Sequence, residues 1–136
     1  MKRTFDNDYL TLEVDEQHKI LHYTWKLASE ELTEDTYLVE ANRILNTFLS
    51  KGCRRIIGDD TNSRVIISPE LQQEVITNIL SMVEGKLEKF AHVASEDIFV
   101  NVSVKQMFED NTALGGDFEE LYFDSVAKAK KWVYEN

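Results

Sequence analysis

The chain has 136 residues, of which 43% are hydrophobic and 10% aromatic, and 25 acidic against 15 basic residues give a net charge of −10. This length and composition predict one globular domain, because disordered chains carry fewer apolar residues. The negative charge repels phosphate backbones and anionic membranes, so nucleic-acid binding is not expected. No apolar run approaches membrane-spanning length, so membrane insertion is not expected either. A single cysteine, Cys53, suits a reducing compartment. The first residues lack the apolar stretch of a signal peptide, so we expect a cytoplasmic protein.

The first half of the chain predicts a β-hairpin followed by a helix. After a polar N-terminal tail, residues 1–8, apolar and polar residues alternate over 9–14 and again over 20–25. Two such runs separated by five residues are typical of a hairpin. From residue 37 to residue 49 the apolar residues recur at steps of three and four, which predicts a helix lying on a sheet. Thr33 is its expected N-cap, and Gly52 follows its end.

The second half predicts strands alternating with helices. A short strand over 53–60 is followed by a helix that begins at Pro69 and carries apolar residues as far as Leu87. A strand is expected within 89–95, mostly helix over 97–111, a strand over 118–124 and a final helix capped by Ser125. The order β-β-α-β-α-β-α-β-α predicts a single α/β domain, residues 9–136, with a mixed, mostly parallel sheet.

One stretch carries a candidate site, at the carboxyl end of the strand over 53–60. Ligands bind at such strand ends in parallel α/β sheets. The candidate residues there are Asp59, Asp60, Thr61, Asn62 and Ser63. The two carboxylates could hold a cation or position a base. We favour the alternative, in which they accept hydrogen bonds from N–H groups of the loop.

The other candidate in this stretch is Ser68. Ser followed by Pro and Glu is a favourable helix start, with the serine as N-cap. A phosphoryl group on Ser68 would instead meet the free N–H groups and the dipole of that helix. The cap explains all three residues and is the favoured interpretation. One cysteine and three scattered histidines do not indicate a zinc site, and no catalytic residue, metal or cofactor is assigned.

Three short stretches, together with the layout of the elements, point to a known family: "RRIIGDDTN", "ISPELQQ" and "SVAKAKKWV". Over residues 9–133 the chain resembles the SpoIIAA-like branch of STAS domains, which is named after the bacterial anti-sigma-factor antagonist. The resemblance implies a four- or five-stranded sheet with helices packed on it, and a regulatory role without catalysis. In these antagonists a kinase phosphorylates a serine at the start of the matching helix. Their Asp-Ser-Ser/Thr-Gly motif is absent here.

These observations lead to three hypotheses of function. The first is a non-enzymatic regulatory or interaction module that binds a protein partner or a small ligand through residues 59–68. An exposed strand edge would also permit a homodimer. The second follows from the relation of this branch to the CRAL-TRIO fold, which implies a small apolar or lipid-like ligand between sheet and helices. The third is a metal-dependent enzyme that uses Asp59 and Asp60.

Overall fold

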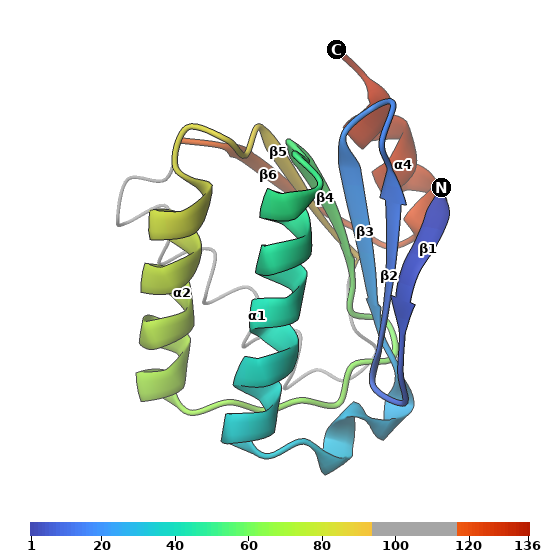
Figure 1. The fold of residues 1–136 in the computed structure, drawn as a ribbon. Helices are drawn as coiled ribbons and strands as arrows, with labels where there is room; N and C mark the ends of the chain where they lie inside the picture. Colours follow the sequence, from blue (N-terminus) through green and yellow to red (C-terminus); the bar gives the residue numbers. More distant parts are fainter. Residues whose placement is uncertain (94–116) are drawn as a thin grey trace.

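The computed structural model describes residues 1–93 and 117–136, which form a six-stranded sheet with helices on both faces (Figure 1). The strands lie side by side in chain order. The first three pair antiparallel, and the third to the sixth pair parallel. The prediction of an α/β domain with a mixed, mostly parallel sheet is thereby confirmed.

The strands are β1 (Lys2–Asp6), β2 (Leu10–Asp15), β3 (Ile20–Trp25), β4 (Arg55–Asp59), β5 (Lys89–Val93) and β6 (Glu119–Phe123). The helices are the short 3₁₀ helix η1 (Leu27–Glu31) and the α-helices α1 (Glu34–Ser50), α2 (Pro69–Val83) and α4 (Val126–Tyr134).

The expected number of strands was too low, because β1 lies in the segment predicted to be a polar tail. Only Phe5 of this edge strand is half-buried, so the sequence shows no alternation there. The Phe5 ring packs against the core and lies 4.1 Å from the guanidinium carbon of Arg43. The second helix is also shorter than the sequence predicts. It ends at Val83, and Leu87 is buried in the connection to β5. The helix predicted over 97–111 lies outside the described residues.

Side-chain caps begin each of the three α-helices within residues 1–93 and 117–136, as the sequence predicts. Thr33 accepts a hydrogen bond from the Thr36 N–H at the start of α1, and the two threonines form a reciprocal capping pair. Ser125 accepts from the Lys128 N–H at the start of α4. These bonds satisfy N–H groups that have no partner within the helix, and each cap contributes about 1 kcal/mol of helix stability.

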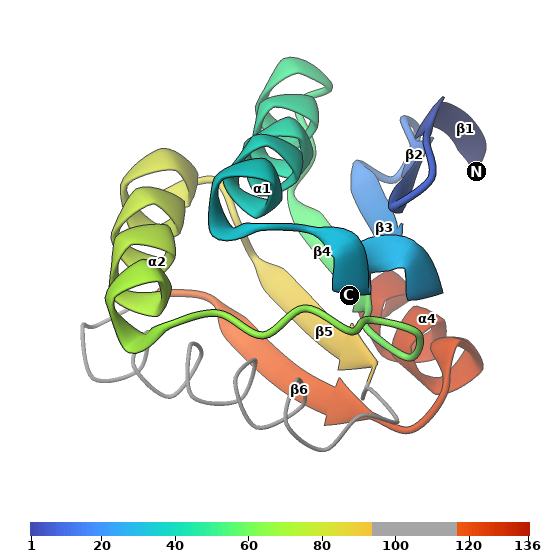
Figure 2. The same ribbon diagram turned by 90° about the horizontal axis from the view of Figure 1, so that it is seen from below.

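Helices α1 and α2 cover one face of the sheet, and α4 covers the other (Figure 2). Because side chains alternate along a strand, β3 contributes to both layers. Tyr23 and Trp25 belong to the larger core beneath α1 and α2, whereas Ile20 belongs to the smaller core beneath α4. The connection from β4 to α2, residues 60–68, runs along the carboxyl ends of the parallel strands and closes one end of the larger core.

Two basic side chains of the sheet hold the end of α4. Lys89 donates from Nζ to the backbone carbonyls of Trp132 and Glu135, both at 2.9 Å. Arg55 donates to the carbonyls of Val133 and Glu135, both at 2.6 Å. Cations stabilise a helix C-terminus because its last carbonyls are unpaired and carry partial negative charge.

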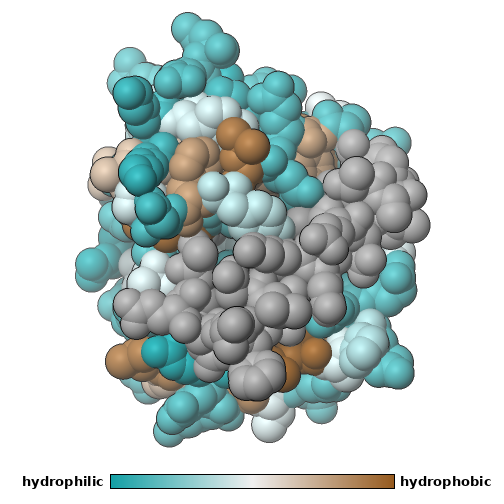
Figure 3. All heavy atoms as spheres, turned by 180° about the vertical axis from the view of Figure 1, so that it is seen from behind, coloured by the Kyte–Doolittle hydropathy of each residue, from teal (hydrophilic) through white to brown (hydrophobic). Residues whose placement is uncertain are grey.

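Polar side chains dominate the visible surface outside the residues drawn in grey, and hydrophobic ones form small separate patches (Figure 3). No helix among residues 1–93 and 117–136 is long and apolar enough to span a bilayer.

Candidate functional site

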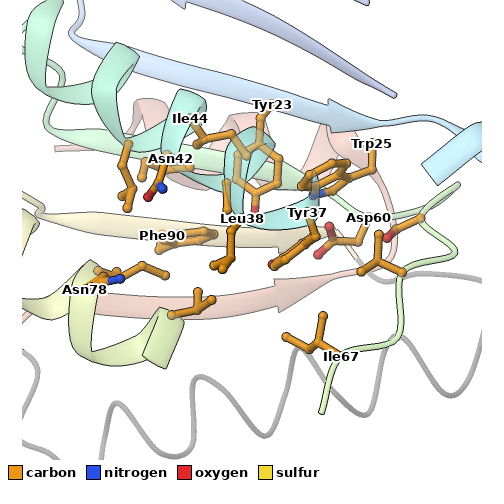
Figure 4. A pocket seen from close by; sticks show the side chains of 17 residues that line it. Tyr23, Trp25, Tyr37, Leu38, Asn42, Ile44, Asp60, Ile67, Asn78 and Phe90 are labelled. Atoms are coloured by element: carbon orange, nitrogen blue, oxygen red, sulfur yellow. The ribbon is translucent and has the colours of Figure 1, made fainter. Parts of the chain in front are cut away.

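A cavity of about 90 Å³ lies between the sheet and helices α1 and α2, at the end closed by the β4–α2 connection (Figure 4). One water needs roughly 10–15 Å³ of such space, so the cavity has room for a small organic molecule. Six segments line it: β3, α1, β4, the connection after β4, α2 and β5, with β4 and β5 contributing one residue each. The lining residues are Tyr23, Trp25, Tyr37, Leu38, Ala41, Asn42, Ile44, Leu45, Ile56, Asp60, Ser63, Val65, Ile67, Val75, Asn78, Ile79 and Phe90.

Four aromatic rings form a large part of this lining. Trp25 from β3 and Tyr37 from α1 stack, with ring centroids 5.6 Å apart and an interplanar angle of 23°. Tyr23 from β3 and Phe90 from β5 meet edge to face, with centroids 6.2 Å apart. Both arrangements are favourable for rings whose faces are negative and whose edges are positive. The rings therefore support one another and present a preformed aromatic wall.

The position of Tyr23 depends on Gly58 in the neighbouring strand. The two residues are register partners in the parallel pair β3–β4. A Cβ atom at Gly58 would lie 2.9 Å from Cε2 of Tyr23 and closer still to the phenol carbon and oxygen. Glycine inside a strand often marks a place where another group approaches the backbone closely. Here that group is the phenol ring of Tyr23.

Asp60 places a carboxyl group in the otherwise largely apolar cavity. Its backbone is held at the strand end, where Asp60 N–H donates to the Val93 carbonyl at 3.2 Å and Ser63 N–H donates to the Asp60 carbonyl at 3.0 Å. The residue is only 4% exposed. Desolvation, with a contribution from the neighbouring charge of Asp59, raises the pKa of Asp60 to about 8. At neutral pH Asp60 is therefore mainly the neutral acid.

The Asp60 carboxyl group accepts no hydrogen bond from any residue within 1–93 or 117–136. The phenol groups of Tyr23 and Tyr37 are close enough to Asp60 for its charge to change their pKa values. Burial raises the pKa of both Tyr23 and Tyr37, and a negative charge on Asp60 raises both further. In Figure 4 the carboxyl end of Asp60 points toward the rings of Trp25 and Tyr37. A polar group at this depth normally has a partner, so its orientation toward a cavity indicates a ligand site.

The two adjacent aspartates have separate surroundings. Asp59 is half-buried and does not line the cavity, and its Oδ1 accepts a hydrogen bond from the Thr61 N–H at 3.0 Å. It is the loop anchor that the favoured interpretation expected, whereas Asp60 is not. Neighbouring side chains of an extended backbone point to opposite sides, which accounts for the difference. The residues described include no group of three or more His, Cys, Asp or Glu side chains placed to hold a metal ion.

The remaining predicted residues divide between the cavity and the surface. Ser63 is 2% exposed and lines the cavity. Thr61 is half-buried and Asn62 is exposed, and neither lines it. The sequence analysis missed the aromatic residues of the site, since it named no aromatic side chain as a candidate. The available signal was the alternation along β3, which puts Tyr23 and Trp25 on one face.

Ser68 is the N-cap of α2, as favoured from the sequence. Its Oγ accepts a hydrogen bond from the Leu71 N–H at 3.2 Å, and Pro69 occupies the first helical position. The Ser68 N–H donates to Oε1 of Glu34 at 3.2 Å, so the first turns of α1 and α2 are linked. A phosphoryl group on Ser68 would face the favourable helix terminus and also the carboxylate of Glu34. Phosphorylation at Ser68 stays a prediction.

Comparison with known proteins gives no match for this chain among protein-family models, curated proteins or solved structures. The function must therefore be argued from the cavity and its residues.

Proposed function

We propose that this chain is a non-enzymatic binding module of the STAS-like type whose ligand occupies the cavity between the sheet and helices α1 and α2. The observation that carries the proposal is the buried Asp60 carboxyl group, which faces an aromatic cavity without a hydrogen bond from the described residues. The cavity also lies where parallel strands end, the usual position of ligands in α/β sheets. This favours the small-ligand hypothesis over the metal-dependent enzyme, because Asp59 and Asp60 do not share a site.

The connection from β4 to α2 relates this cavity to the regulatory role implied by the resemblance. Val65 and Ile67 line the cavity, whereas Ile66 between them is 64% exposed. A ligand that displaces the inner two side chains would also move Ile66 at the surface. We therefore propose that a protein partner recognises the ligand-bound form of the chain through residues 59–68. This proposal combines the two binding hypotheses.

A fragment screen with a cavity-filling variant tests the proposed function. Ala41 lines the cavity from α1, so Ala41→Phe should occupy the ligand's space. Val39 is on the same helix, 55% exposed and outside the lining, which makes Val39→Phe the matched control. Ligand-observed NMR should find fragments that bind the native chain and Val39→Phe but not Ala41→Phe. The proposal fails if no fragment binds the native chain, or if the hits bind Ala41→Phe equally well.

A further inference from the structure

The cavity has the charge and ring composition of a site for a cation. Among its described lining residues the only ionisable groups are Asp60, Tyr23 and Tyr37, and none is lysine, arginine or histidine. The faces of aromatic rings attract cations, Trp most strongly, and the attraction grows when the cation leaves water. The negative faces are thus supplied by Trp25, Tyr37, Tyr23 and Phe90. Among the described lining residues, Asp60 is the one side chain that can form a carboxylate.

The Asp60 carboxyl group gives the second, independent indication. A carboxylate that is 4% exposed and has no hydrogen-bond partner among the described residues is costly to ionise. A bound cation would remove that cost by direct ion pairing. Asp60 is also not needed to hold the loop by its side chain, since the side-chain bond to the loop backbone comes from Asp59. Its carboxyl group is therefore available to a ligand.

We propose, building on the binding function above, that the ligand is a small organic cation, an ammonium group with apolar substituents. The charge would lie between the Asp60 carboxylate and the faces of Trp25 and Tyr37. The apolar substituents would contact the aliphatic wall formed by Leu38 and Ile79. A cavity of about 90 Å³ suits an ammonium carrying a few carbon atoms rather than a long lipid chain.

Binding of such a cation should release a proton. Burial raises the pKa of Asp60 to about 8, so below that pH the carboxyl group must lose a proton to pair with a permanent cation. The ionisable groups around Asp60 are Asp59 at the end of β4, whose charge raises the pKa of Asp60, and the phenols of Tyr23 from β3 and Tyr37 from α1, whose pKa values a charge on Asp60 raises. The lining residues of α2 and β5 carry none. Both phenols stay neutral between pH 6 and 8 because their pKa values are raised, so Asp60 should set the pH profile.

Isothermal titration calorimetry with matched probes tests the charge preference. Choline is compared with 3,3-dimethyl-1-butanol, in which carbon replaces the charged nitrogen, and benzylamine with benzyl alcohol. At pH 7.5 at least one cation should bind the native chain about 10-fold or more tightly than its neutral partner. For choline, the affinity should rise up to about 10-fold from pH 6 to pH 7 and level off above about pH 8. The affinity of the neutral probe should not change over this range.

Two isosteric variants separate the possible outcomes. Asp60→Asn keeps the shape and hydrogen-bonding ability of the side chain and removes its charge, so it should remove most of the preference for cations and retain neutral probes. Asp59→Asn makes the same change outside the cavity and should retain the preference. The inference is overturned if neutral probes bind as tightly as cations, if Asp60→Asn keeps the preference, or if choline affinity is independent of pH. In those cases binding itself stands, whereas failure of all four probes and of the fragment screen would remove the proposed function as well.

Discussion

The burial of Asp60 predicts that the native chain loses stability as the pH rises, and that Asp60→Asn does not show this loss. The pKa of Asp60 is about 8 in the folded state, against 3.8 for the unperturbed carboxyl group. Between these values the folded chain holds a proton that the unfolded chain has released. The stabilisation from that proton is therefore complete below about pH 4 and is lost progressively as the pH rises through the folded pKa.

The magnitude follows from the width of this window. Each pH unit between the two pKa values changes the free energy of unfolding by about 1.4 kcal/mol. From pH 5 to pH 8, where the slope flattens, the native chain should lose about 3 to 4 kcal/mol relative to Asp60→Asn. This is a large part of the roughly 5–15 kcal/mol that stabilises a typical domain.

Urea denaturation at pH 5, 6, 7 and 8 measures this difference directly. The two chains should have similar unfolding free energies at pH 5 and diverge at pH 8, with Asp60→Asn the more stable. Asp59→Asn is the control, because it retains Asp60 and should retain most of the fall with pH. A constant difference between the native chain and Asp60→Asn from pH 5 to pH 8 would refute the assignment of Asp60 as a buried neutral acid.

Three further predictions concern the surroundings of the cavity. Gly58→Ala should lower the unfolding free energy by roughly 1–3 kcal/mol, because the new methyl group overlaps the Tyr23 ring, and denaturation measures this loss. Ser68→Ala should cost about 1 kcal/mol through loss of the hydrogen bond from the Leu71 N–H, measured in the same way. Cys53 should react slowly with a thiol reagent in the folded chain at pH 8, because it is buried and its pKa is raised to about 11, chiefly by burial.

Each of these three has an outcome that contradicts it. The cost of Gly58→Ala should shrink in a Tyr23→Leu background, and an unchanged cost there would exclude the ring as its cause. Ser68→Asp retains a capping oxygen and should recover stability, so equal losses in Ser68→Ala and Ser68→Asp would argue against the cap. Labelling of Cys53 in the native chain as fast as in urea would show that the thiol is accessible.

The elements that sequence analysis predicted best are those whose pattern is local. The hairpin of β2 and β3 and the stripe of α1 follow from spacing along the chain, and the caps at Thr33 and Ser125 follow from residue type. Strand β1 was not predicted because it has no such local pattern: as an edge strand it turns only Phe5 toward the core. Its pairing with β2 depends on backbone groups that the sequence pattern does not reveal.

Local sequence patterns predicted only one half of the candidate site. Asp60 and Ser63 were predicted, since they follow a strand that must end at the ligand-binding edge of the sheet. The aromatic half brings together rings from β3, α1 and β5, which are far apart in the chain, and no spacing rule indicates that they meet. The distinct roles of Asp59 and Asp60 arise because neighbouring side chains of an extended backbone point to opposite sides. The sequence prediction treated the two aspartates as one pair.

Methyl NMR of isoleucine tests the central claim, that a small organic cation binds inside this cavity, most directly. Ile56, Ile67 and Ile79 line the cavity, whereas Ile57 lies beneath α4 and Ile66 is exposed on the connection. Saturation with the tighter of choline and benzylamine should shift the δ1-methyl signals of the first three and leave Ile57 nearly unchanged. Ile66 should move less than its neighbour Ile67. Shifts confined to Ile66, shifts of similar size at Ile57, or no shifts with either cation would contradict the account.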